Sequence, residues 1–288
     1  MKKYAVIDIG SNSVRLLLVA DGKVLYKRLK TTRLGENLAV SGKLLQEAIS
    51  RSATAVAEFY HLAKKEGAED VLAFATASVR FAKNGGDFLL AVKELCPLQV
   101  EVISGETEAE IGVLGALGNS DGAVLDIGGA STELIVRRQG ECVYKKSLDI
   151  GAVRLKDICG RDREKLEKVC KKAVESFGEV PKIDTLTAVG GTATTLCAVA
   201  LGLEEYDGER VTGATVSKTC LQALINEFFQ KSVEEIAKIP CISAGREDII
   251  TGGAVLFFTV IDYLGLQNFC ASDRDNLEGY AVKKGYLV

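Results

Sequence analysis

The chain has 288 residues, 47% of them hydrophobic, and a formal net charge of −3, so it can bury the cores of two ordinary domains. This weakly negative net charge argues against non-specific binding to nucleic acid. Eight cysteines without a Cys-x-x-Cys pair, and a single histidine, His61, leave little material for zinc sites, Ser-His-Asp triads or disulfide frameworks. No apolar run is long enough for a signal peptide or a membrane span, so we expect a cytoplasmic protein.

The hydrophobic pattern predicts two copies of one element order, three strands followed by helices that alternate with two further strands. The first copy has strands near 4–9, 13–20 and 23–30, a helix at 44–66, a strand at 70–75, helices, a strand at 98–103 and a helix at 104–118. The second has strands near 122–127, 131–138 and 141–148, a helix at 162–177, a strand at 184–189, helices, a strand at 267–271 and a closing helix at 276–285.

Turn-forming residues from Gly118 to Gly122 separate the two copies. We therefore expect an α/β fold of two duplicated domains, each a mixed sheet flanked by helices, with a cleft between them. The expected domains are residues 1–119, joined by the closing helix within 273–288, and residues 120–272.

One motif occurs in both copies, as Asp8-Ile-Gly-Ser-Asn-Ser and as Asp126-Ile-Gly-Gly-Ala-Ser. Each copy follows an apolar strand and leads into another, and the small residues let backbone amides approach an anion, as in loops that bind phosphate and its metal. A third loop, Val189-Gly-Gly-Thr, follows a strand and begins a helix, whose amino end attracts anions. Three such loops predict a phosphate-binding protein.

Further segments extend this pattern over the whole chain: Arg33-Leu-Gly-Glu, Thr76-Ala-Ser-Val-Arg-Phe-Ala-Lys-Asn84, Ile103-Ser-Gly-Glu-Thr-Glu-Ala109 and Gly151-Ala-Val-Arg-Leu. Together these segments resemble the exopolyphosphatase and guanosine pentaphosphate phosphohydrolase family, within the superfamily of actin, Hsp70 and sugar kinases. The resemblance implies ribonuclease H-like (actin-like ATPase) domains. It also implies hydrolysis, with Mg²⁺ or another divalent cation, of the terminal phosphoanhydride of inorganic polyphosphate or pppGpp.

The resemblance further assigns roles to residues in the matched segments. Glu108 matches the general base, Arg80 a phosphate-gripping arginine, and Asp126 and Glu133 the carboxylates for Mg²⁺ and its water; Asp8 is the equivalent of Asp126 in the first copy and a further candidate metal ligand. The expected phosphate-binding positions are Ser11, Asn12, Ser13, Gly128, Gly129, Ser131, Gly190, Gly191 and Thr192, with Arg33 and Arg154 as weaker cationic candidates.

Simpler readings stay open for several of these residues. Asp8 could bond only the amides of its own turn, Gly191 could be only a helix-entry turn, and Glu106, Glu108 and Glu110 could be acids favoured in a first helical turn. The basic residues Arg137, Arg138, Lys145 and Lys146 are expected on the solvated side of a strand pair.

Within the family we favour an exopolyphosphatase that acts on short polyphosphate chains, because the histidine-rich HD domain of longer members is not expected here. Two departures from the family pattern are Ala130, where a third glycine is usual, and Asn276-Leu-Glu-Gly279 near the end. The alternatives are a pppGpp 5′-phosphohydrolase and a weakly catalytic sensor of polyphosphate or (p)ppGpp. An actin-like ATPase or sugar kinase is disfavoured because its nucleoside signature is not evident. No nucleic-acid or membrane partner is expected, and a homodimer is left open.

Overall fold

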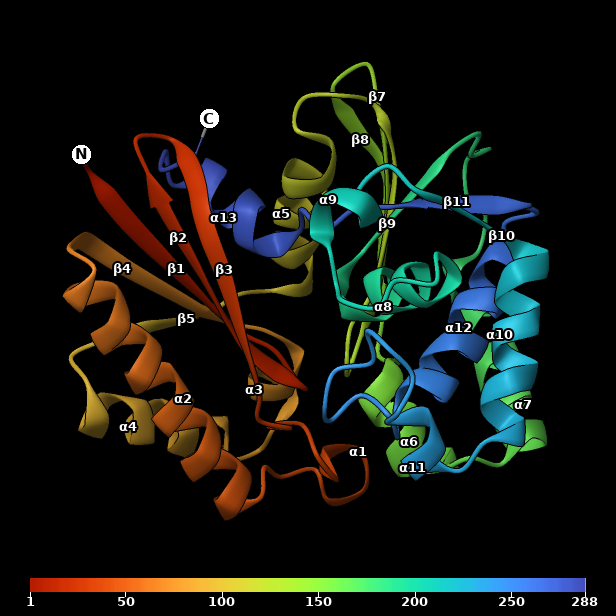
Figure 1. The fold of residues 1–288 in the computed structure, drawn as a ribbon, viewed down its shortest axis with the longest axis horizontal. Coiled ribbons are helices and arrows are strands. Elements are labelled where there is room, and N and C mark those ends of the chain that lie inside the picture. The colour runs from red at the N-terminus through yellow and green to blue at the C-terminus, as the bar shows by residue number, and fades with distance from the viewer. Residues whose placement is uncertain (288) are drawn as a thin grey trace. The chain divides into compact units, whose positions relative to one another are not determined.

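The computed structural model describes residues 1–287, which form two compact units (Figure 1). Unit 1 consists of Met1–Gly115 and Asn276–Val288, and unit 2 consists of Ala116–Asp275. The sequence pattern predicts these divisions near 119/120 and 272/273. Both units combine one mixed sheet with flanking helices, so the predicted α/β fold class is confirmed.

Unit 1 is built on a five-stranded sheet in the order β3-β2-β1-β4-β5. Its strands are β1 (Lys3–Ile9), β2 (Ser13–Ala20), β3 (Lys23–Thr31), β4 (Ala68–Ala75) and β5 (Val100–Val102). β1 pairs antiparallel with β2 and parallel with β4. The helices are α1 (Leu38–Ser41), α2 (Gln46–Lys65), α3 (Ala77–Phe81), α4 (Gly85–Leu95), α5 (Gly105–Leu117) and α13 (Asn276–Lys283).

The alternation of side chains along β1 explains why helices cover both faces of this sheet. Ala5, Ile7 and Ile9 belong to the core that includes residues of α2 and α4. Val6, which points to the opposite face, packs in a separate cluster with Leu277 and its neighbours on α13. Because β1 is apolar on both sides, it becomes the buried centre of the sheet.

Unit 2 is built on a six-stranded sheet in the order β10-β11-β9-β6-β7-β8. Its strands are β6 (Gly122–Ile127), β7 (Thr132–Arg138), β8 (Glu141–Leu148), β9 (Leu186–Val189), β10 (Thr215–Ser217) and β11 (Asn268–Ala271). The helices are α6 (Ala152–Cys159), α7 (Arg163–Val174), α8 (Gly190–Ala200), α9 (Gly208–Val211), α10 (Lys218–Gln230), α11 (Val233–Ile236) and α12 (Ile250–Tyr263).

Two features of unit 2 differ from the sequence prediction. The helix expected over 162–177 ends at Val174 and continues as a 3₁₀ turn, Glu175–Phe177. The short strand β10, which the pattern did not predict, pairs antiparallel with β11 at the edge of the sheet. Within the described residues no helix is both long and apolar enough to cross a membrane.

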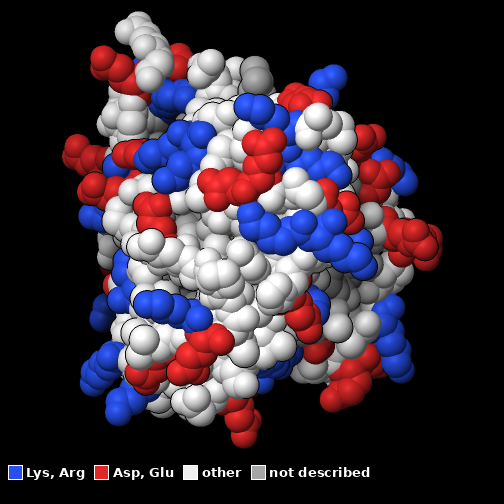
Figure 2. Space-filling view, turned by 90° about the vertical axis from the view of Figure 1, so that its left-hand side faces the viewer, with Lys and Arg blue, Asp and Glu red and all other residues white. Residues whose placement is uncertain are grey.

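Figure 2 shows the face on the left of Figure 1, where basic and acidic side chains are interspersed. In unit 1, exposed ion pairs such as Lys3–Glu66, at 4.0 Å, and Lys284–Glu101, at 3.4 Å, join residues far apart in the sequence. Exposed pairs of this kind contribute little to stability. They do limit the local excess of either charge.

Candidate active site

The loops between the first two strands of each unit close with the same hydrogen bond. The Gly10 amide donates to the Ser13 carbonyl at 3.0 Å in unit 1, and the Gly128 amide donates to the Ser131 carbonyl at 3.0 Å in unit 2. The strand registers also match, since Asp8 faces Arg15 and Asp126 faces Glu133, each pair seven residues apart. The two copies of the motif therefore adopt the same local turn.

The loop of unit 1 is held by the segment that follows β3. The amides of Thr32 and Arg33 both donate to the Asn12 carbonyl at 2.9 Å, and the Gly35 amide donates to the Ser11 carbonyl at 2.8 Å. Gly35 is required for this approach, because a Cβ there would lie 2.9 Å from the Ser11 Cβ. Ser11, Asn12 and Ser13 are buried as a result.

The Asn12 side chain is the clearest sign of a ligand position in unit 1. It is 9% exposed, and neither its oxygen nor its nitrogen has a hydrogen-bond partner among residues 1–287. Leaving a buried polar atom unsatisfied costs about 1–3 kcal/mol. Native proteins rarely do so without a functional reason, and an anion with its counterion would satisfy both atoms.

Asp8 forms an ion pair with Arg15, the residue opposite it on β2. Arg15 Nε donates to Asp8 Oδ2 at 2.9 Å, and Arg15 Nη2 makes a second, shorter contact with the same oxygen. A guanidinium on this carboxylate already neutralises it. Asp8 is therefore a weaker candidate metal ligand than the sequence analysis expected.

Glu108 and Arg80, to which the resemblance assigns the base and a phosphate-gripping arginine, lie in contact in unit 1. Glu108 lies in the first turn of α5 and is 7% exposed. Arg80, in α3 just beyond the end of β4, places Nη1 3.3 Å from Glu108 Oε2 and 2.7 Å from the Ile103 carbonyl. The Phe81 ring lies 5.0 Å from the Arg80 guanidinium carbon, which fixes the guanidinium from another side.

The burial of the acids at the start of α5 separates Glu108 from its neighbours. Glu106 and Glu110 are exposed, whereas Glu108 faces inward, and Glu110 contacts Lys283 at 3.5 Å. A carboxylate favoured only by the helix dipole has no need to be buried. The simpler reading of the first turn therefore fits Glu106 and Glu110 but does not account for Glu108.

In unit 2 the loop after β6 is braced by the start of α6. The Ala152 amide donates to the Gly128 carbonyl at 2.9 Å, and the Arg154 amide donates to the Gly129 carbonyl at 3.0 Å. Arg154 thus contributes its backbone to the loop, while its Nη1 donates to the Asp149 carbonyl at 2.9 Å. Ala130 is buried and is not among the described non-glycine residues with positive φ, so its Cβ introduces no backbone strain there.

Three polar residues of unit 2 stand in one row across three strands. Asp126 on β6 faces Glu133 on β7, which in turn faces Ser147 on β8. Directly paired residues point to the same side of a sheet with Cβ atoms about 5 Å apart. Ser147 Oγ donates to Glu133 Oε1 at 2.7 Å, so this hydroxyl, which the sequence analysis missed, orients the carboxylate.

The third loop contacts this row at Asp126. Gly190 has φ +77, and a Cβ there would collide with Asp126 Oδ1, so only glycine allows the carboxylate its position. Thr192 Oγ1 donates to the Ile127 carbonyl at 2.9 Å, which ties α8 to the end of β6. The hydroxyl of Thr192 is therefore used to join the two loops.

Arg246 is a candidate that the sequence analysis did not identify. Its guanidinium lies against Gly191, in the space that a Cβ of that residue would occupy. Gly191 is thus more than a helix-entry turn. The segment before α12 carries no local signal for this contact, because it depends on how α12 packs against the rest of unit 2.

The residues present fit a hard divalent cation. Among residues 1–287, no three His, Cys, Asp or Glu side chains gather in an arrangement that would hold a metal. Mg²⁺, however, needs only one or two protein carboxylates and takes its other oxygens from phosphate and water. The paired Asp126 and Glu133 carboxylates can provide two such ligands.

Comparison with known proteins gives consistent relatives. A model of the Ppx/GppA phosphatase family matches residues 5–286. The chain is 31% identical over 319 residues to "Exopolyphosphatase 2" of Mycobacterium tuberculosis, with 98% of each chain covered. It is 28% identical to "Bifunctional 3-dehydroquinate synthase/phosphatase" of Fusobacterium nucleatum, spanning 98% of this chain but 46% of that protein. Identity to "Guanosine-5'-triphosphate,3'-diphosphate pyrophosphatase" of Aeromonas hydrophila is 26%, spanning 99% of this chain and 58% of that one.

Solved structures agree over nearly the full chain. An exopolyphosphatase-like protein superposes with a TM-score of 0.92 at 25% identity, covering 98% of both chains. The Ppx/GppA protein of Aquifex aeolicus superposes with a TM-score of 0.80 at 28% identity, covering 99% of this chain and 97% of that one. With the family match across residues 5–286, these findings show that the chain belongs to the Ppx/GppA phosphatase family.

Proposed function

We propose that this protein is an exopolyphosphatase, a hydrolase that removes the terminal phosphate of inorganic polyphosphate, with short chains as its preferred substrates. The observation that carries the proposal is the buried Glu108 carboxylate 3.3 Å from Arg80 Nη1, in a unit whose first loop holds the unsatisfied Asn12 amide. Identity of 31% to a relative named exopolyphosphatase, over 98% of both chains, supports polyphosphate as the substrate.

Glu108 acts as the general base in this proposal. It takes a proton from a water molecule whose oxygen attacks the terminal phosphorus. The bond to the bridging oxygen breaks, its electron pair stays on the shortened chain, and inorganic phosphate is released. Before substrate binds, Arg80 holds the Glu108 carboxylate in place; a phosphate group then competes for the guanidinium, whose fork also matches phosphate oxygens.

The other assigned residues bind and neutralise the substrate. Amides of the three loops receive phosphate oxygens, with Asn12 as a side-chain partner in unit 1 and the Arg246 guanidinium beside the third loop in unit 2. Mg²⁺ held by Asp126 and Glu133 would supply charge neutralisation and a positioned water. Ser147 keeps Glu133 oriented for that task. A cytoplasmic location remains a prediction.

The test is phosphate release from tripolyphosphate, long polyphosphate, pppGpp and ATP at equal concentrations of phosphate termini. We expect the highest kcat/KM on polyphosphate. Higher kcat/KM on pppGpp would assign the alternative activity, which the Aeromonas relative's name suggests. Binding of these compounds without release of phosphate would instead identify a sensor.

Glu108→Gln should reduce kcat by on the order of 10²- to 10⁴-fold, because a positioned base is lost. KM should stay constant or fall, since a negative charge near the substrate is removed. Glu110→Gln is the matched control, being an exposed acid on the same helix, and should turn over normally. Near-normal turnover by Glu108→Gln would refute the assignment of the base.

A further inference from the structure

Unit 2 contains a cavity of about 210 Å³ at the end of its sheet away from the phosphate loops. The cavity is lined by residues at the start of β6, at the end of β7 and just before β9: Asp121, Gly122, Ala123, Val136, Arg137, Arg138, Lys182, Ile183, Asp184 and Thr185. β6 and β9 are parallel, so their starts share one edge and the loops after them share the other. With a rise of about 3.3 Å per residue, β6 separates the two by about 17 Å.

Two guanidinium groups that border this cavity are bonded to backbone carbonyls. Arg137 Nη2 donates to the Gly118 carbonyl at 2.7 Å and also to the Ser120 carbonyl. Arg138 Nη2 donates to the Lys182 carbonyl. Among residues 1–287 neither arginine forms an ion pair, and Arg137 Nε is buried without an acceptor. The backbone holds both groups in place. Arg137 also interacts electrostatically with Asp121, so Arg138 is the less neutralised of the two.

The two acids of the cavity differ in how they are held. Asp121 accepts hydrogen bonds from the amides of Gly140, at 3.0 Å, and Gln139, at 2.6 Å, and these bonds, with a smaller contribution from Arg137, lower the pKa of its carboxyl. Asp184 lies 3.6 Å from Lys182 Nζ, but both side chains are more than three-quarters exposed, at 79% and 88%. An exposed pair with this separation is weak, so Lys182 can turn to a ligand at little cost.

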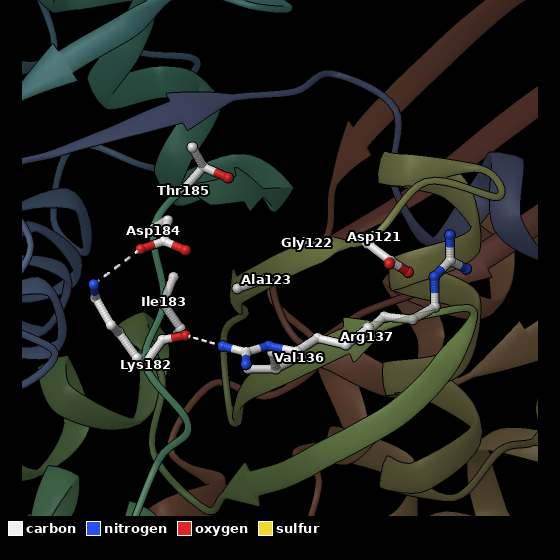
Figure 3. Close-up of a pocket in the computed structure, with 10 residues that line it drawn as sticks. Asp121, Gly122, Ala123, Val136, Arg137, Lys182, Ile183, Asp184 and Thr185 are labelled. Atoms are coloured by element: carbon white, nitrogen blue, oxygen red, sulfur yellow. Dashed lines mark hydrogen bonds and ion pairs between the residues drawn. The ribbon is translucent and has the colours of Figure 1, made fainter.

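The floor of the cavity is apolar and its wall is polar. Ala123, Val136 and Ile183 are buried, and Figure 3 shows Lys182, Asp184 and Thr185 following one side while Asp121 and Arg137 lie across from them. Three cations against two acids leave one net positive charge. The volume corresponds to about seven water molecules at roughly 30 Å³ each.

We propose that this cavity is a second anion site, which binds the phosphate group of a compact molecule, either free phosphate or a small phosphomonoester. Arg138 and Lys182 contact the phosphate oxygens, and Thr185 can donate its hydroxyl. The apolar floor accommodates a short carbon chain. Planar guanidinium groups fixed by the backbone suit bidentate binding of phosphate. The site is independent of the hydrolytic activity proposed above.

The experiment maps amide chemical-shift changes by NMR in the full chain, titrated with inorganic phosphate, glycerol 3-phosphate and acetate. We expect saturable shifts at Ala123 and Thr185 with both phosphate compounds, distinct from any shifts at Gly128 and Ser131, and much weaker shifts with acetate. Tighter binding of glycerol 3-phosphate would assign the ester, and equal binding would assign free phosphate as sufficient. Shifts confined to the phosphate loops, or equal shifts with acetate, would overturn the proposal.

Arg138→Gln should weaken the cavity shifts at least tenfold, and Lys182→Gln should weaken them less. The matched control is Arg163→Gln, which removes another exposed charge in the same unit, on α7, where Arg163 pairs with Glu167. Equal weakening by the control would mean that only net charge matters and would also overturn the site. Phosphate release from polyphosphate by each variant, measured separately, should match the unmodified protein.

Discussion

Gly190→Ala tests whether the position of Asp126 controls turnover, and Gly202→Ala provides a control with a similar left-handed backbone. Both glycines have positive φ, +77 at Gly190 and +62 at Gly202, but only Gly190 has a neighbour, Asp126 Oδ1, in the space of the new Cβ. Alanine in a left-handed conformation costs about 1 kcal/mol at either position. Any further effect of Gly190→Ala must come from displacing the carboxylate.

The displacement should be large enough to affect catalysis. The Asp126 oxygen must retreat by roughly an ångström to reach normal contact distance, and a misplacement of about 1 Å in an active site costs on the order of 10²-fold in rate. Urea unfolding should therefore show a loss of about 1 kcal/mol for Gly202→Ala and at least as much for Gly190→Ala. Phosphate release from tripolyphosphate should fall about 10²-fold only for Gly190→Ala.

The comparison separates strain from geometry. Equal kcat values for the two variants, with both folded at the assay temperature, would refute the role given to Asp126 and its contact with the third loop. A rise in the Mg²⁺ concentration needed for half-maximal activity in Gly190→Ala, absent in Gly202→Ala, is the expected companion result. It follows because a displaced carboxylate binds the cation less well.

Three further outcomes are expected. Phe81→Leu should lower kcat about two- to fivefold, because the contact between the ring and the Arg80 guanidinium is worth about 0.5–1 kcal/mol at such a site. Phe81→Tyr keeps an aromatic ring and should retain the rate of the unmodified protein. Equal rates for both variants would contradict this role. Burial raises the pKa of Tyr144 to about 12, above the unfolded value near 10. Its contribution to the free energy of unfolding is therefore complete below pH 10 and is lost between pH 10 and about 12. In urea unfolding, the free energy of unfolding should decrease less between pH 9 and pH 11 for Tyr144→Phe than for the unmodified protein. Excess EDTA should abolish phosphate release and added Mg²⁺ should restore it, whereas full activity in EDTA would refute the cation requirement.

The sequence predicted the parts of the fold that local pattern determines. β1 and β6 are apolar runs interrupted by turn residues, and both the strands and their loops lie where the pattern placed them. β10 was missed because three residues, Thr215–Ser217, give too short an alternation to recognise. Its pairing with β11 is a tertiary contact, and the periodicity of hydrophobic residues along the sequence does not predict such a contact.

The candidate site was predictable to a similar degree. Glu108 and Arg80 came from the family resemblance, and the structure adds their 3.3 Å contact. Ser147 could have been found by extending the hairpin register across β7 and β8, because it follows directly from pairing. Arg246 could not, since its guanidinium reaches Gly191 only through the packing of α12.

The difference between the two copies lies at one register position. In unit 1 the residue opposite the strand-end aspartate is Arg15, and in unit 2 it is Glu133. A carboxylate beside a guanidinium forms a neutral pair, whereas two adjacent carboxylates repel each other until a cation joins them. The duplicated hairpin therefore gives unit 1 an anion loop whose aspartate is already neutralised, and gives unit 2 a place suited to a divalent cation.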